Sequence, residues 1–147
     1  MFVWDTEAPA CGGNNEWWGF RHDDYNTGTY GTDTRHPVAI LDLKKTLTGF
    51  RASGRPFPGV TPTAVLTWTA PGDDYRCGTA QSYEIRTARK PIKTPADWAS
   101  AKSVGGAPAP AAPGTVQSVT LSNPPGVYFA VRTRDDAGNL SPISQGG

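Results

Sequence analysis

Apolar and polar residues alternate along three stretches of the chain, and each stretch predicts a β-strand with one buried face. The stretches are residues 64–70, 83–88 and 127–134. In the first, Ala, Leu and Trp alternate with mostly Thr, and in the second the alternate positions carry Glu and Arg. A repeat of two places successive side chains on opposite faces of a sheet. The charged positions are therefore expected to face outward.

Shorter apolar segments predict further strands. The run from Val38 to Leu43 is expected to be the first strand, and Val119 and Leu121 mark one face of a later strand. A loop that contains several Gly and Pro residues is expected from Thr48 to Pro62.

Residues 90–114 predict a helical turn followed by an extended segment. Thr94-Pro95 favours the start of a helix over residues 94–99, because Thr caps a helix well and Pro suits its first position. Residues 105–114 are rich in Pro, Ala and Gly, so we expect them to be extended and exposed.

Residues 1–36 show no sustained period of either kind. They are dominated by Gly, Asn, Asp, Thr and aromatic residues, and we interpret them as an N-terminal extended arm. Residues 37–147 then form one domain, which suits a chain of 147 residues. With 17 Gly, 14 Pro and a hydrophobic share of 37%, the composition favours many short strands and an all-β fold.

The charge distribution excludes one class of function and suggests a contact. Net charge is +1 and Lys and Arg form no run, so the chain lacks the electrostatic pattern of a nucleic-acid binder. Residues 1–36 hold six acids and two bases, whereas the rest of the chain holds seven acids and twelve bases. This asymmetry favours contact between arm and domain, within one chain or between chains.

Two cysteines, Cys11 and Cys77, bear on the cellular compartment of the protein. A disulfide between them would place the protein in an oxidising, extracellular setting, and the alternative is two free thiols in a cytosolic protein. No apolar run is long enough for a membrane span. Residues 1–4 lack the basic start and apolar core of a signal peptide, so a secreted protein would be represented here as a mature form or a fragment.

Two separated segments resemble fibronectin type III domains. The first contains TWTAPGDD (67–74), GTA (78–80) and SYEIR (82–86), and the second contains FAV (129–131), DDAGN (135–139) and SPIS (141–144). Both are similar to such domains of bacterial secreted proteins, and to the module of calcium-activated chloride channel regulators. The resemblance covers about residues 37–144 and implies an immunoglobulin-like β-sandwich. It also implies a core that contains Trp68, Tyr83, Ile85, Phe129 and Val131.

The last strand departs from this family. Members continue past the Ser-Pro segment into a seventh strand, but here only Ser144-Gln145-Gly146-Gly147 follows. A sandwich that lacks an edge strand exposes unpaired backbone groups. We therefore expect strand addition by the arm of a neighbour, with Met1, Phe2, Val3 and Trp4 as the donor strand. Such head-to-tail contacts build a filament.

Two simpler arrangements remain open for this edge. Residues 1–4 can fold back on their own domain, or residues 141–145 can suffice as a short strand. The resemblance also implies that the loop with Cys77 lies at the pole where the first strand starts, so that a bridge to Cys11 forms either within one chain or between subunits.

Other residues suggest weaker sites. Asp73, Asp74, Asp135 and Asp136 lie in loops that the resemblance brings to one pole and are candidate calcium ligands, although acidic turns are usually only solvated. Trp17, Trp18 and Phe20 are expected to form a protein interface, with a sugar-binding platform as the alternative. Asn139 begins an N-glycosylation sequon.

No arrangement typical of an enzyme is apparent. His22 and His36 are the only histidines, and the sequence contains no nucleophile elbow, metalloprotease motif or phosphate-binding loop. We expect no cofactor and no catalysis. The leading hypothesis is a secreted structural or adhesive subunit that polymerises; the alternatives are a carbohydrate- or surface-binding accessory module, and a spacer domain from a larger protein.

Overall fold

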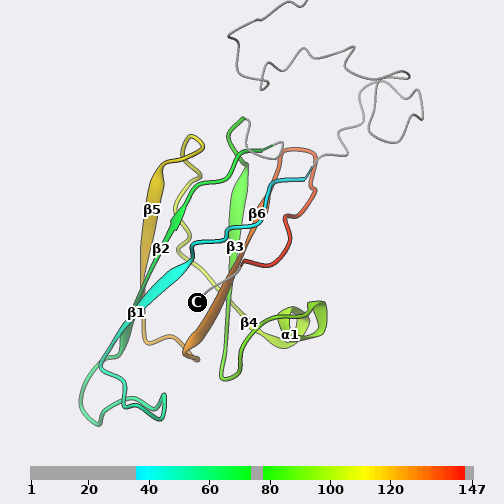
Figure 1. The fold of residues 1–147 in the computed structure, drawn as a ribbon. Coiled ribbons are helices and arrows are strands. Elements are labelled where there is room, and N and C mark those ends of the chain that lie inside the picture. The colour runs from blue at the N-terminus through cyan, green and yellow to red at the C-terminus, as the bar shows by residue number, and fades with distance from the viewer. Residues whose placement is uncertain (1–35, 74–77, 145–147) are drawn as a thin grey trace, which may run out of the picture.

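The computed structural model describes residues 36–73 and 78–144, which form two antiparallel sheets and one short helix (Figure 1). The first sheet has the order β1-β2-β5 and the second has the order β4-β3-β6. The all-β architecture expected from the sequence is confirmed. The element bounds are β1 Lys44–Thr48, β2 Thr63–Thr69, β3 Ser82–Ala88, α1 Pro95–Ser100, β4 Lys102–Val104, β5 Val116–Ser122 and β6 Tyr128–Arg134.

The central strands follow the predicted alternation. In β2 and β3 every second residue is buried. Leu66 of β2 pairs with Val119 of β5, and Ile85 of β3 pairs with Val131 of β6. All four side chains belong to one core cluster, so the inner faces of the two sheets pack against each other as the layers of a sandwich.

Trp68 is the largest side chain of this core. It is 1% exposed, and its ring meets that of Tyr83 edge to face, with centroids 5.2 Å apart. The Tyr83 hydroxyl donates to Gln117 Oε1 at 2.6 Å. Burial raises the pKa of Tyr83, in the direction that favours the protonated hydroxyl.

The predicted first strand is wrong. The regular strand β1 begins at Lys44, whereas residues 38–43 follow an irregular path past the other strands (Figure 1). Ile40 and Leu43 are both buried at a spacing of three, and Leu41 between them is 63% exposed. A spacing of three is incompatible with the two-residue repeat of a strand, so core packing decides the path of this segment.

The predicted helical turn is confirmed as α1. Thr94 Oγ1 accepts from the backbone N–H of Asp97 at 3.1 Å, and Asp97 Oδ2 accepts from the backbone N–H of Thr94 at 2.9 Å, which makes a capping box. The short edge strand β4, which follows the helix, had not been predicted. Residues 105–114 contain no helix or strand, as expected, but residues 112–114 form a bend and turn, and Ala107 packs against the core, so the segment is not exposed throughout.

Candidate functional site

The C-terminal segment, residues 139–144, covers part of the outer edge of β6. The backbone N–H of Ser141 donates to Thr133 O at 2.8 Å, and that of Ser144 donates to Val131 O at 3.1 Å. In the opposite direction, the N–H groups of Thr133 and Val131 donate to the hydroxyls of Ser141 and Ser144, each at 2.9 Å. Both serines are buried, so their hydroxyls take the place of the carbonyls of a neighbouring strand.

This arrangement corrects the expectation of a fully open seam. From Val131 to Arg134 the edge of β6 is occupied by the chain's own residues, and Leu140 makes an antiparallel bridge to Arg134. This is close to the alternative in which residues 141–145 act as a short strand. A strand donated by a neighbour cannot pair here unless it displaces Ser141 and Ser144.

One residue of the same edge is not covered by this segment. Alternate residues of a strand direct their backbone groups to the same side, so Phe129 faces this edge together with Val131 and Thr133. No backbone hydrogen bond joins Phe129 to residues 139–144. Among the described residues, the part of this edge that no backbone bond of the C-terminal segment covers is therefore short and lies at the start of β6.

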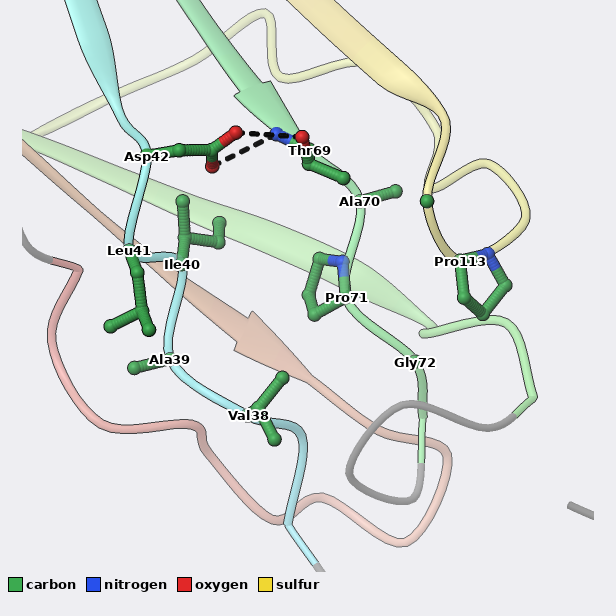
Figure 2. Close-up of a pocket in the computed structure, with 11 residues that line it drawn as sticks. Val38, Ala39, Ile40, Leu41, Asp42, Thr69, Ala70, Pro71, Gly72 and Pro113 are labelled. Carbon is green, nitrogen blue, oxygen red and sulfur yellow. Dashed lines mark hydrogen bonds between the residues drawn. The ribbon is translucent and has the colours of Figure 1, made fainter. Parts of the chain in front are cut away.

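A mostly apolar groove lies where the described chain begins. It has a volume of about 390 Å³ and is lined by Val38–Asp42, Thr69–Gly72 and Pro113–Gly114. Figure 2 shows Val38 pointing toward Pro71, while Leu41 points away from it. The sequence-based expectation that the loop after β2 and the start of the domain share one pole fits this groove.

Asp42 closes one end of this groove. Its carboxylate accepts from the hydroxyl of Thr69 at 2.6 Å and from the backbone N–H of Thr69 at 3.1 Å (Figure 2). The hydroxyl bond holds the pKa of Asp42 below its usual range, against the opposing effect of burial. Asp42 therefore joins the irregular segment to β2, and the rest of the groove offers apolar contact.

The outer face of the second sheet carries an aromatic residue whose role the sequence did not reveal. Trp98 of α1 is buried with Ile92, Ala101 and Ala130. The guanidinium of Arg86 lies 4.9 Å from the ring centre of Trp98, and that of Arg132 lies 5.6 Å from it. In the sequence, only its place as the fourth residue of a capped helix could have indicated that Trp98 packs against the sheet. Because both cations cover the ring, Trp98 is an anchor for α1 and offers no open platform for a sugar.

Both arginines of this cluster have hydrogen-bond acceptors, and Arg86 also has an ion pair with Glu84. Arg86 donates to Glu84 Oε1 through Nε and Nη2, at 2.8 and 2.6 Å, and to Trp98 O at 2.8 Å. Burial lowers the pKa of Arg132, and its Nε donates to Ser141 O at 2.6 Å. Arg132 thus links the Trp98 cluster to the C-terminal segment that closes β6.

The core residues named from the sequence lie together in the structure. Trp68, Tyr83, Ile85, Phe129 and Val131 are all buried in the same cluster between the sheets.

The aspartates proposed as calcium ligands do not share one environment. Asp135 is fully buried, and its Oδ1 accepts from the backbone N–H of Asn139 at 2.6 Å, which closes the turn after β6. Asp136 is exposed and Asp73 is half-buried. Within residues 36–73 and 78–144, no three His, Cys, Asp or Glu residues are grouped closely enough to hold a metal ion. Ser141, the hydroxyl residue of the Asn139 sequon, is buried in the folded chain.

The other predicted residues lie outside the described part of the chain. These are Met1, Phe2, Val3, Trp4, Cys11, Trp17, Trp18, Phe20, Asp74 and Cys77. The predictions of a disulfide, a donor strand and an aromatic interface therefore stay predictions.

Comparison with known proteins yields no relative. No family model, no curated protein and no solved structure matches this chain. The one described helix, α1, has six residues, and no helix of the described chain is long and apolar enough to cross a membrane.

Proposed function

We propose that this chain is an extracellular structural subunit, built on a fibronectin-type-III-like sandwich, that assembles head to tail. In this proposal the arm, residues 1–36, of one copy binds the sandwich of the next. A central Trp on the second strand, two three-stranded sheets and the Ser-Pro segment that returns along β6 support the family resemblance.

One observation carries the assembly proposal: the chain's own C-terminal segment covers the β6 edge from Val131 to Arg134 but does not bond Phe129. A donor of four residues, Met1 to Trp4, suits such a short edge. Its backbone would pair with this edge, and its apolar Phe2 and Trp4 side chains would lie on one face of the added strand. An extracellular location follows from the proposed use of Cys11 and Cys77 as a disulfide.

The arm would leave the sandwich from the end where the described chain starts, and a binding site at the other end would let the same contact repeat from copy to copy. The described chain starts beside the groove of Figure 2, while β6 starts at the opposite pole (Figure 1). A contact between two different surfaces does not close on itself unless a ring forms, so it propagates as a filament.

Sedimentation and electron microscopy of the full chain test this proposal. Wild type is expected to form concentration-dependent linear oligomers, and deletion of residues 1–8 should reduce them to monomers. Asn14→Ala/Asn15→Ala, which changes the arm outside the donor strand, is the matched control and should assemble as wild type does.

Two results would contradict the proposal. Unchanged assembly of the deletion variant would exclude residues 1–8 as the donor. A wild-type monomer that is retained on an insoluble polysaccharide would support the carbohydrate-binding module instead.

A further inference from the structure

Residues from three segments line a second groove, which we name the basic groove. These segments lie at the pole where β6 starts (Figure 1). They are the β1–β2 loop, the end of β3 and the β5–β6 turn. The larger part of the groove has a volume of about 920 Å³, and an adjoining hollow of about 430 Å³ shares several of its walls. The charged and aromatic residues that line the two parts are Lys45, Phe50, Arg51, Arg55, Phe57, Arg89 and Tyr128.

The charge of this groove is of one sign. No Asp or Glu occurs in residues 43–72, 85–96 or 98–134, which include every segment that lines it. The single ion pair found among the described side chains joins Arg86 to Glu84, away from this pole. Four cations, Lys45, Arg51, Arg55 and Arg89, therefore line the groove without a carboxylate partner from the described chain.

Apolar rings alternate with these cations. Phe57 is 47% exposed, and the Arg51 guanidinium lies 5.5 Å from its ring centre. Lys45 Nζ lies 4.5 Å from the ring centre of Tyr128, and burial lowers the pKa of this lysine. Pro56, Pro58 and Pro125 add further apolar surface. A ligand that carries both anionic groups and apolar rings is complementary to this lining.

The loops hold the groove in one shape. Gly54 adopts a φ of +74°, and a Cβ there would lie 3.2 Å from Val127, so the loop tip packs directly on the β5–β6 turn. The N–H of Phe57 donates to Gly49 O at 2.9 Å, and that of Val127 donates to Ala88 O at 3.1 Å. A preformed site requires little ordering when a ligand binds.

We propose that the basic groove binds the acidic, aromatic segment Glu16–Tyr25 of a second copy of this chain. This segment holds three acids, one base and four aromatic residues, and residues 1–36 as a whole carry a net charge of −4. Its composition is thus complementary to the groove in both charge and ring content. The inference rests on the proposed head-to-tail assembly and identifies where the middle of the arm docks.

Chain length favours a neighbouring copy over the same copy. Residues 26–36 span at most about 40 Å when fully extended. Strands of seven residues are already about 23 Å long, and loops add to the sandwich at both ends. The segment of the same chain would have to run nearly straight along the sandwich to reach the groove, whereas the arm of a stacked neighbour starts beside it.

Sedimentation equilibrium of charge-reversal variants tests this contact. Arg55→Glu/Arg89→Glu is expected to weaken self-association at least tenfold. Lys93→Glu/Lys102→Glu has the same change in net charge at exposed positions outside the groove, and should associate about as wild type does. Asp23→Arg/Asp24→Arg should lose association, and an equimolar mixture with Arg55→Glu/Arg89→Glu should regain it, because opposite charges then meet at every contact. Circular dichroism spectra identical to wild type show that the variants fold.

The outcomes separate this inference from the proposed function. If deletion of residues 1–8 abolishes assembly while Arg55→Glu/Arg89→Glu leaves it intact, the groove contact is wrong and head-to-tail strand addition stands. If the groove variant abolishes assembly and the deletion does not, the groove contact stands without strand addition. A wild-type monomer, or a mixture that does not regain association, overturns the groove contact, and binding of an anionic polysaccharide by such a monomer would identify a different ligand.

Discussion

The hydroxyl of Ser141 accepts a hydrogen bond from the backbone N–H of Thr133 at 2.9 Å and donates one to Pro142 O at the same distance. A buried side-chain hydroxyl thereby replaces the backbone carbonyl that a neighbouring strand would supply as acceptor. Ser144 does the same for Val131, so a segment without regular strand structure closes most of the edge of β6. This edge decides what a neighbouring chain can reach.

Ser141→Ala is expected to lower the free energy of unfolding by about 1–3 kcal/mol, because it leaves the buried N–H of Thr133 without an acceptor. Chemical denaturation followed by circular dichroism measures this change. Ser103→Ala, at an exposed position of β4, is the matched control and should change stability by less than about 0.5 kcal/mol. Equal effects of the two substitutions would show that the serine bonds do not stabilise the edge.

Trp98→Ala is expected to destabilise the fold by about 3 kcal/mol, because it removes the buried side chain that holds α1 on the second sheet. It also deprives Arg86 and Arg132 of the ring that they cover. Thr94→Ala removes only the helix cap and should cost about 1 kcal/mol. Urea unfolding of both variants tests the order, and a larger effect of the cap would contradict the anchoring role of Trp98.

Gly126→Ala is expected to prevent normal folding. A Cβ at this position would overlap Ala88 O, a backbone atom that cannot move aside cheaply, and would lie 2.8 Å from Thr87 Oγ1. Gly105→Ala is the control, because nothing lies within 4 Å of its Cβ position. Soluble yield and thermal unfolding compare the two. A Gly126→Ala variant as stable as Gly105→Ala would show that the β5–β6 turn does not pack closely on β3.

Asp42 is expected to make stability depend on pH in the acid range. Its pKa in the folded state is held below the ordinary value of 3.8 by the Thr69 hydroxyl, so its contribution is fully present above that value. The contribution is lost as pH falls through the folded-state pKa. Because the carboxylate is largely open to solvent, Asp42→Asn should cost only about 0.5 kcal/mol at neutral pH.

Unfolding free energies of wild type and Asp42→Asn, measured from pH 7 to pH 2, test this dependence. The difference between the two proteins should be constant above pH 5 and should shrink toward zero at the acid end. A difference that does not change with pH would show that the charge of Asp42 contributes nothing.

The local sequence pattern was sufficient to predict an element where the burial of its side chains follows the repeat of the backbone. β2, β3 and β6 were predicted because each alternates between a core and an outer face, and α1 because Thr94 and Asp97 satisfy each other's backbone within one turn. These features need no information from distant residues.

The predictions failed where a distant contact decides the conformation. Residues 38–43 look like a strand, but Ile40 and Leu43 both turn into the core, and Asp42 bonds Thr69, which lies 27 residues away in the chain. β4 is too short to show a repeat, and it forms because β3 offers it an edge. The basic groove joins loops from three parts of the sequence, so only their charges were visible beforehand.

The sequence by itself determined the all-β class, the strands that carry the core and the absence of acids from the segments that line the basic groove. Tertiary structure alone decided the path of residues 38–43, the position of Trp98 under two arginines and the closure of β6 by Ser141 and Ser144. The physical reason is the range of these interactions. Alternation and capping act between residues close in the chain, whereas a buried N–H donates to whichever acceptor the packed fold brings to it.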